Sequence, residues 1–174
     1  MKPKCILFLA SLFALGVNAG DFGPVGGTGG REWRVTANDD ESIVELRVGA
    51  VDRVDSIAVA IGSPNGDKFR QAADNRFGGK GGKENQFRLG DGECLTEVHG
   101  TTAIARNKRP TESVFSIYFV TSKGRRSGTY GVESGGKQFH LVAEPGKEIN
   151  GLFGRAGDEL DGIGVITRDK RHCK

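Results

Sequence analysis

Three acidic residues stand close together near the C-terminus, and they are the first side chains to consider for chemistry: Asp158, Glu159 and Asp161. Two carboxylates hydrolyse a glycosidic bond when they face each other across it and one of them has a raised pKa. Neighbours on one short, exposed turn cannot take up opposed positions. The sequence also has no GxSxG elbow, and its three histidines are too scattered to complete a Ser/His/Asp set. We therefore predict that the protein is not an enzyme.

Glycine clusters recur along the chain at nearly equal intervals. Residues 26–30 read GGTGG, residues 78–82 read GGKGG, and residues 134–136 give the reduced form SGG. An aromatic side chain follows each cluster within a few residues: Trp33, Phe87 and Phe139. Glycine weakens strands and helices, so a repeated cluster marks places where the backbone turns sharply or lies close against another group. The aromatic residues fall inside strand patterns and are expected in the core.

Residues 1–19 have the layout of a secretory signal peptide, with Lys2 and Lys4, then an apolar stretch, then small residues before Gly20. We expect cleavage there and a secreted protein, with one domain over residues 20–169 and a basic tail over residues 170–174. The chain has 25 Lys and Arg against 22 Asp and Glu, and loss of the leader lowers the formal charge from +3 to +1. This balance disfavours nucleic acid as a partner, and no other segment is apolar enough for membrane insertion.

The cysteine count predicts one disulfide. Cys5 leaves with the leader, so Cys94 and Cys173 remain as a pair in an oxidising compartment. An intramolecular bond would tie the C-terminal tail to the body of the domain, and the alternative is that Cys173 pairs with another chain. The histidines are far apart and no cysteine pair has the CxxC form, so neither a metal site nor another cofactor is expected.

Six short stretches rich in β-branched or aromatic residues predict strands: 42–48, 55–61, 94–100, 113–121, 139–142 and 162–167. No window has a convincing helical stripe, so the pattern favours an all-β antiparallel fold. The glycine clusters and strand patterns keep the same spacing. We therefore expect three units of one β motif, packed as three small sheets around a pseudo-threefold axis.

Together these motifs resemble the jacalin-related lectin family, in its mannose-binding type. The resemblance rests on GPVGGTGG near the predicted mature N-terminus, on FGGKGG, on TYGVESGGKQFHL and above all on GLFGRAGDELDGIGV, and it spans roughly residues 22–169. It implies the β-prism I fold, which has three four-stranded Greek-key sheets with pseudo-threefold symmetry. Residues 157–161 then match the GxxxD sugar-binding loop of the family.

The resemblance further implies a metal-free site for mannose- or glucose-type glycans. In the family, the aspartate carboxylate bridges two sugar hydroxyls, amides of the residues before it donate to the ring oxygen and the exocyclic hydroxyl, and a glycine of the first GG loop donates from the other side. Carried over by position, the site residues are Gly30, Gly157, Asp158, Glu159, Leu160 and Asp161. A carboxylate suits the task because it accepts two hydroxyls at once, and glycine leaves backbone N–H groups accessible.

Other interpretations of the same residues stay open. Asp161 could cap the turn into the last strand, and the glycine clusters could be tight hairpin corners. The protein could also be a secreted β-prism interaction module, acting in defence, in a matrix or as an effector, that binds protein or lipid rather than sugar. A homo-oligomer is compatible with the sequence.

The internal repeat predicts a second, weaker sugar site. Residues 51–55 align with residues 157–161 and would face the second glycine cluster, which gives the candidate residues Asp52, Asp55, Gly81 and Gly82. Val51 replaces the first glycine of the motif, so we expect backbone strain or a shifted loop if that position requires positive φ. Arg53 adds a bulky side chain beside the site. In the remaining unit Phe115 stands in place of the aspartate, so no third site is expected.

Overall fold

The computed structural model describes residues 20–63, 69–70, 76–104, 111–133 and 135–173. The predicted leader lies outside these residues, as do Ser134 of the third glycine cluster and Lys174 of the predicted tail. The described residues form strands, turns and bends and contain no helix, hence none that could cross a membrane. The all-β prediction is confirmed for this part of the chain.

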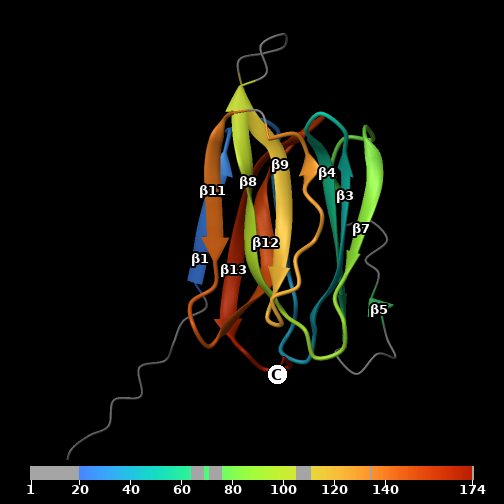
Figure 1. Ribbon diagram of the computed structural model, residues 1–174, viewed down its shortest axis with the longest axis vertical. Coiled ribbons are helices and arrows are strands. Elements are labelled where there is room, and N and C mark those ends of the chain that lie inside the picture. The colour runs from blue at the N-terminus through green and yellow to red at the C-terminus, as the bar shows by residue number, and fades with distance from the viewer. Residues whose placement is uncertain (1–19, 64–68, 71–75, 105–110, 134, 174) are drawn as a thin grey trace, which may run out of the picture.

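The strands run along the long axis of the molecule (Figure 1). In chain order they are β1 Gly20–Gly26, β2 Arg31–Thr36, β3 Ser42–Ala50, β4 Val54–Gly62, β5 Phe69–Arg70, β6 Arg76–Gly78, β7 Lys83–Arg88, β8 Leu95–Ile104, β9 Glu112–Thr121, β10 Tyr130–Gly131, β11 Lys137–Val142, β12 Lys147–Ala156 and β13 Leu160–Asp169. Each of the six predicted strands lies largely within one of them.

All strand pairs are antiparallel, and they form an eight-stranded and a five-stranded sheet. The larger sheet consists of β1-β13-β12-β2 and β11-β8-β9-β10, which are joined only through the pairing of Ile149 in β12 with Leu95 in β8. In the smaller sheet β3 pairs with β7 and β4, and β4 also pairs with β5 and β6. Strand β13 lies between β1 and β12, so the two ends of the domain meet in one sheet.

The core lies between these sheets and is built from buried side chains of β2, β3, β4, β7, β8, β9, β11, β12 and β13. Trp33, Phe87 and Phe139, which follow the three glycine clusters, are all buried, as their place in the strand patterns predicts. The Trp33 ring stacks on Phe77 with 4.3 Å between the ring centroids. Burial of such large rings is a dominant contribution to the stability of a small domain. The aromatic residues are therefore structural side chains.

A disulfide joins Cys94, just before β8, to Cys173 after β13, with 5.4 Å between the Cα atoms. The prediction of an intramolecular bond is confirmed. The Glu148 carboxylate lies within 4.8 Å of both sulfur atoms, but these are bonded to each other. Its buried charge is instead met by the guanidinium of Arg168, whose Nε lies 2.6 Å from Glu148 Oε1. Pairing of this kind is what a buried carboxylate requires.

Candidate functional site

Loop 157–161 connects β12 to β13 and carries the acidic residues with which the sequence analysis began. A register shift between Arg155 and Ala156 precedes it, and the turn is closed by the Gly157 N–H, which donates to the Glu159 carbonyl at 3.0 Å. Leu160 is fully buried and anchors the start of β13. Asp161 is only 8% exposed, which is unusual for an aspartate and marks it as the buried acid of the loop.

Glycine loop 26–30, between β1 and β2, packs directly on Asp161. The Gly27 N–H donates to the Asp161 carbonyl at 2.8 Å. A Cβ atom added at Gly29 would lie 2.5 Å from Asp161 Oδ1, and one added at Gly30, where φ is +59°, would lie 2.2 Å from the carbonyl carbon of Ala156. Only glycine permits approaches this close. Gly30 and Asp161, from opposite ends of the sequence, thus both lie beside Gly157, where a Cβ atom would be 3.4 Å from Gly30 Cα and 3.6 Å from Asp161 Oδ2.

The Asp161 carboxyl has a pKa above its ordinary value. Burial is the largest cause, because it disfavours the charged form, and the negative charges of Glu159 and Asp158 act in the same direction. A hydrogen bond from the Gly157 backbone and the positive charge of Arg155 partly offset the rise. The carboxylate therefore takes up a proton at higher pH than an exposed aspartate does.

Arg155 is a functional residue that sequence reasoning missed. Its Nε donates to the Gly29 carbonyl at 2.9 Å and its Nη2 to the Gly30 carbonyl at 2.8 Å, while Nη1 lies 2.9 Å from Glu32 Oε1. One planar guanidinium thus fixes two consecutive peptide groups of the glycine loop. The two sides of this contact are more than a hundred residues apart in the chain, and no local pattern announces it.

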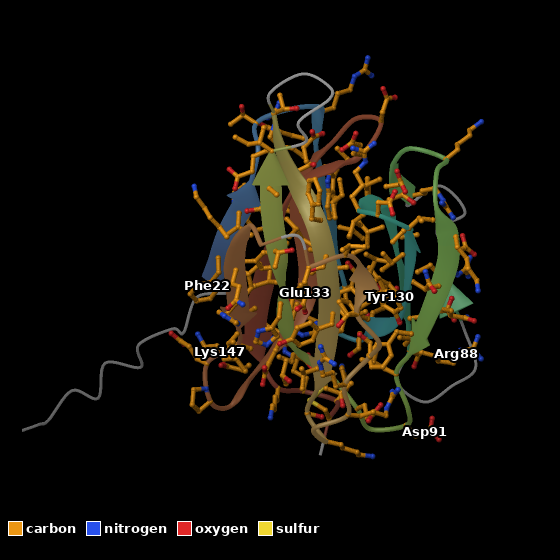
Figure 2. All side chains as sticks on the ribbon, turned by 45° about the horizontal axis from the view of Figure 1, so that its top comes forward. Phe22, Arg88, Asp91, Tyr130, Glu133 and Lys147 are labelled. Atoms are coloured by element: carbon orange, nitrogen blue, oxygen red, sulfur yellow. A yellow bond between two sulfur atoms is a disulfide. The ribbon has the colours of Figure 1, made fainter. Side chains whose placement is uncertain are left out.

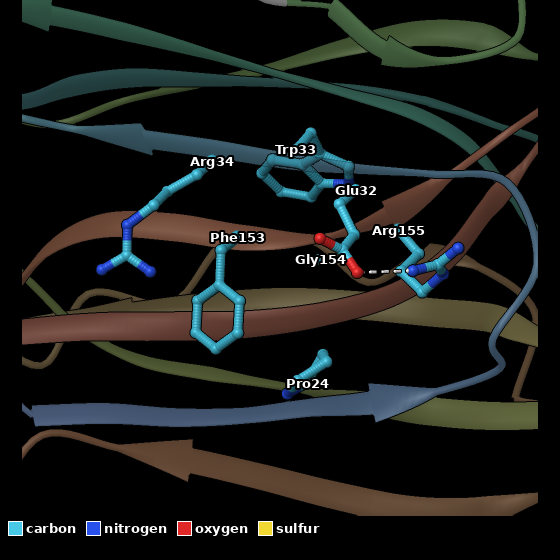
Figure 3. Close-up of a pocket in the computed structure, with 7 residues that line it drawn as sticks. All are labelled: Pro24, Glu32, Trp33, Arg34, Phe153, Gly154 and Arg155. Atoms are coloured by element: carbon cyan, nitrogen blue, oxygen red, sulfur yellow. Dashed lines mark hydrogen bonds and ion pairs between the residues drawn. The ribbon is translucent and has the colours of Figure 1, made fainter.

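A hollow of about 410 Å³ lies beside the loops, on the face formed by β1, β12 and β2 (Figure 3). Its lining residues are Pro24, Glu32, Trp33, Arg34, Phe153, Gly154 and Arg155. Asp161 is not among them. The hollow and the candidate site share Arg155 alone, which turns its guanidinium toward Glu32 at the edge of the hollow. The candidate site is therefore the pair of loops and not a deep pocket.

Loop 51–55, between β3 and β4, has the same frame, by which we mean the preceding register shift, the hydrogen bond that closes the turn and the contacts with a glycine loop. A register shift between Gly49 and Ala50 precedes it, and the Val51 N–H donates to the Arg53 carbonyl at 3.3 Å. The Gly79 N–H donates to the Asp55 carbonyl at 2.9 Å. A Cβ atom at Gly81 would lie 2.9 Å from Asp55 Oδ1, and one at Gly82 would lie 2.7 Å from Asp55 Oδ2. Asp55 thus meets glycine loop 78–82 as predicted, while Asp52 is exposed at the tip.

The condition under which we expected backbone strain or a shifted loop at Val51, a requirement for positive φ, is not met. No described residue other than glycine has positive φ, and Gly157, the matching residue of the first loop, is not among the glycines that do. Both turns are closed by an equivalent backbone hydrogen bond at ordinary φ, which any L-residue can adopt. Val51 projects into solvent with 59% of its surface exposed.

Residues 111–115, at the start of β9, form the third equivalent of these loops. The Val132 N–H donates to the Phe115 carbonyl at 3.1 Å, and a Cβ atom at Gly131 would lie 2.0 Å from that oxygen. Phe115 therefore occupies the position of Asp161 and Asp55, and it offers an aromatic ring where they offer a carboxylate.

Glu159, the middle residue of its loop, contacts the middle residues of the other two loops. Arg53 Nη1 lies 3.2 Å from Glu159 Oε1, and the Ser113 hydroxyl donates to Glu159 Oε2 at 3.2 Å. The Arg53 and Glu159 side chains are 25% and 19% exposed, and Ser113 is buried. The sequence predicts a role for the Glu159 backbone, and the contact of its carboxylate with the neighbouring loops has no signal in the sequence.

Comparison with known proteins agrees with this architecture. The family model of the jacalin-like lectin domain matches residues 22–166. Horcolin of Hordeum vulgare is 35% identical over 144 residues, which cover 82% of this chain and 92% of horcolin. The solved mannose-binding lectin from champedak is 32% identical, with a TM-score of 0.74 and coverage of 86% and 97% of the two chains. A mannose-binding jacalin-related lectin from Ananas comosus, at 22% identity, has the same fold, with a TM-score of 0.74 over 87% of this chain and 99% of its own.

These similarities place the molecule in the β-prism I class of antiparallel all-β folds. The chain belongs to the jacalin-like lectin domain family.

Proposed function

We propose that the protein is a secreted lectin that binds mannose- or glucose-type glycans without a metal ion, through loop 157–161 and glycine loop 26–30. The observation that carries this proposal is the enclosure of the Asp161 carboxylate by Gly29, with Gly30 and Gly157 alongside. A buried carboxylate flanked by bare backbone is suited to a ligand that offers several hydroxyl groups at once.

Each residue of the loop has a distinct proposed role. The Asp161 carboxylate accepts hydrogen bonds from two sugar hydroxyls. The backbone N–H groups of Asp158 and Glu159 donate to the ring oxygen and the exocyclic hydroxyl, and Gly30 donates from the opposite side. Leu160 contributes only its backbone, since its side chain is buried. Charge-assisted bonds of this kind are about twice as strong as neutral ones.

We interpret the strands as three four-stranded Greek-key sheets around a pseudo-threefold axis. The single residue pair between β12 and β8 supports a division of the eight-stranded sheet into two sets of four. Three equivalent loop contacts, at Asp161, Asp55 and Phe115, support the symmetry. The axis emerges, on this interpretation, where Arg53, Glu159 and Ser113 meet.

The mannose or glucose preference is supported by the relatives, since the champedak and Ananas comosus lectins are both named for mannose binding. Secretion is supported by the predicted leader over residues 1–19 and by the disulfide, because such bonds persist in oxidising compartments. We propose residues 20–169 as the lectin domain and residues 170–174 as its tail.

Loop 51–55 is proposed as a second site of low affinity. Asp55 faces Gly81 as Asp161 faces Gly29, and it also lies close to Gly82. Its neighbour Arg53 directs a positive charge toward the other loop rather than toward hydroxyl groups. The second loop therefore has the frame of a sugar site with a less suitable set of side chains.

A glycan array at neutral pH with EDTA present, followed by calorimetry with methyl mannoside and methyl galactoside, tests the proposal. We expect mannoside binding that survives the chelator, with one strong site per chain. No signal on any glycan would contradict it and would favour a β-prism module that binds protein or lipid. Binding abolished by EDTA would contradict the metal-free mechanism.

A further inference from the structure

Three side chains from three separate loops converge beside the proposed sugar site. Glu159 of loop 157–161 receives Arg53 Nη1 at 3.2 Å from loop 51–55 and the Ser113 hydroxyl at 3.2 Å from the start of β9. These residues occupy the same third position in their loops. The connections from β3 to β4 and from β12 to β13 and the start of β9, which carry them, lie at the end of the molecule opposite the C-terminus (Figure 1).

The contact controls where the Glu159 charge lies. Glu159 stands two residues before Asp161, and its negative charge is the second largest cause of the raised Asp161 pKa. Arg53 forms an ion pair with Glu159 and so partly neutralises that charge. Since both partners are mostly buried, solvent screens the pair less than it would at an exposed site. Without Arg53, Glu159 would be a partly buried acid beside a second acid that must stay ionised.

The contact also holds the shape of the turn. The Glu159 carbonyl accepts the hydrogen bond that closes loop 157–161, while its side chain is fixed on one side by Arg53 and on the other by Ser113. A side chain held at both carboxylate oxygens restricts the backbone that carries it. The N–H groups of residues 158 and 159 are thereby kept in one orientation.

We infer that Arg53 is a positioning residue for the Asp161 sugar site, although it belongs to the other loop. The inference rests on the proposed function. Arg53 acts through Glu159: it fixes the turn that presents the backbone donors, and it keeps Asp161 ionised at lower pH. The two loops are thus parts of one site in energetic terms.

The charged groups that face Asp161 come from several elements. Asp158 and Glu159 lie on its own loop and raise its pKa, whereas Arg155 on β12 lowers it. Glu32 on β2 pairs with Arg155, and Arg53 pairs with Glu159. Glu112 on β9 is engaged by the Thr102 hydroxyl. Removal of Arg53 alone therefore leaves the Glu159 carboxylate without its ion-pair partner, close to Asp161.

Mannoside titration across pH tests the inference, with every variant made in an Asp55→Ala background so that only the Asp161 site is measured. Arg53→Ala should weaken binding about three- to tenfold at neutral pH. As pH falls, binding is lost when Asp161 takes up a proton. Since the uncompensated Glu159 charge favours that proton, the acid limb of the binding curve should move to higher pH. A residue that served only stability would leave the acid limb in place.

Two further variants separate charge from geometry. Arg53→Lys retains the charge, so its acid limb should stay close to that of the Asp55→Ala protein. In a Glu159→Gln background, Arg53→Ala should have little further effect, because the negative charge with which Arg53 pairs is absent. The Arg53→Lys comparison does not depend on whether Arg53→Ala itself folds, and a shift of its acid limb as large as that expected for Arg53→Ala would contradict the role of the charge.

Arg88→Ala is the matched control. Arg88 pairs with Glu45 and lies at the far end of β7 from the loops, near Asp91 (Figure 2). Its loss should leave both the affinity and the acid limb unchanged. An unchanged affinity and acid limb for Arg53→Ala would overturn the inference alone. No mannoside binding by the Asp55→Ala protein, or full binding by a chain that also carries Asp161→Ala, would overturn the proposed function, and the inference with it.

Discussion

Loops 157–161 and 51–55 have the same backbone frame and different chemistry. In each, the N–H of the first residue donates to the carbonyl of the third, and the aspartate carbonyl accepts from a glycine loop. In each, a glycine Cβ would strike the aspartate carboxylate. They differ at three side chains, since Gly157, Glu159 and Leu160 in one correspond to Val51, Arg53 and Val54 in the other. Leu160 and Val54 are both buried, so the exposed differences are at the first and third positions.

The comparison indicates that the backbone conformation of a loop and the groups that it offers to a ligand are determined by different residues. Glycines and backbone hydrogen bonds build the frame in all three units, including the one that carries Phe115 in place of an aspartate. Side chains at the first, third and fifth loop positions then decide what the frame can bind. A sequence repeat therefore conserves a scaffold more faithfully than it conserves a site.

Removing each carboxylate in turn is the strongest way to break the comparison. Asp161→Ala should lower mannoside affinity by more than about 100-fold, because it removes two charge-assisted hydrogen bonds. Asp55→Ala should leave the strong site intact. Calorimetry on both variants, with thermal melts to verify folding, measures the effect. Loss of binding only on Asp55→Ala would reverse our ranking of the two loops.

A matched pair of glycine substitutions tests the frame. In Gly29→Ala the new Cβ would stand 2.5 Å from Asp161 Oδ1, so the carboxylate must move and mannoside affinity should fall about tenfold or more. Gly81→Ala places its Cβ 2.9 Å from Asp55 Oδ1 and should not affect the strong site. Equal losses in the two variants would mean that the loops contribute equally to binding.

Removal of the disulfide should lower the stability of the protein without changing the mannoside affinity of either loop. Cys94 and Cys173 are 79 residues apart and lie at the end of β13 remote from Asp161. Replacing both with serine should lower the free energy of unfolding by about 2–4 kcal/mol, as measured by urea denaturation. Mannoside affinity below the transition should be unchanged. A large loss of affinity in the folded variant would show that the disulfide end is coupled to the loops.

The smallest expected effect is on the mannoside affinity of loop 51–55, and it comes from the substitution of Val51. Val51→Gly should raise mannoside affinity at loop 51–55 only a few-fold, since Val51 is unstrained and projects into solvent. Calorimetry on an Asp161→Ala chain isolates this loop. A gain as large as the loss caused by Asp161→Ala would mean that the glycine, and not the side chain at position 53, distinguishes the two loops.

The strands that sequence could predict are those with several apolar residues in alternation. Strands β2 and β7 were not predicted, because each has few inward apolar residues between charged ones. Trp33 and Val35 are buried in β2, and Phe87 alone is buried in β7. Strand β12 was also missed. Gly151 and Gly154 interrupt its apolar pattern, yet they are needed because neighbouring backbone lies within 3 Å of where their Cβ atoms would be.

The candidate site divides in the same way. Its glycines and Asp161 could be predicted because they form compact motifs, and the structure brings them together. The contacts of Arg155 with Gly29, and of Arg53 and Ser113 with Glu159, could not, because each joins residues that are far apart in the chain. The backbone conformation at Val51 could not be read from the motif either. A glycine in a motif can mark positive φ, whereas Gly157 adopts ordinary φ and a Cβ there would make only ordinary contacts, 3.4 Å from Gly30 Cα and 3.6 Å from Asp161 Oδ2.

The meeting of β1 with β13 also has a consequence for synthesis on the ribosome. Glycine loop 26–30 is among the first parts of the domain to be made, and Asp161 is among the last. A nascent chain, or one that ends before β13, contains the bare backbone of the site and lacks its carboxylate. The proposed strong site is therefore completed late in synthesis, after loop 51–55 and glycine loop 78–82 have already been made.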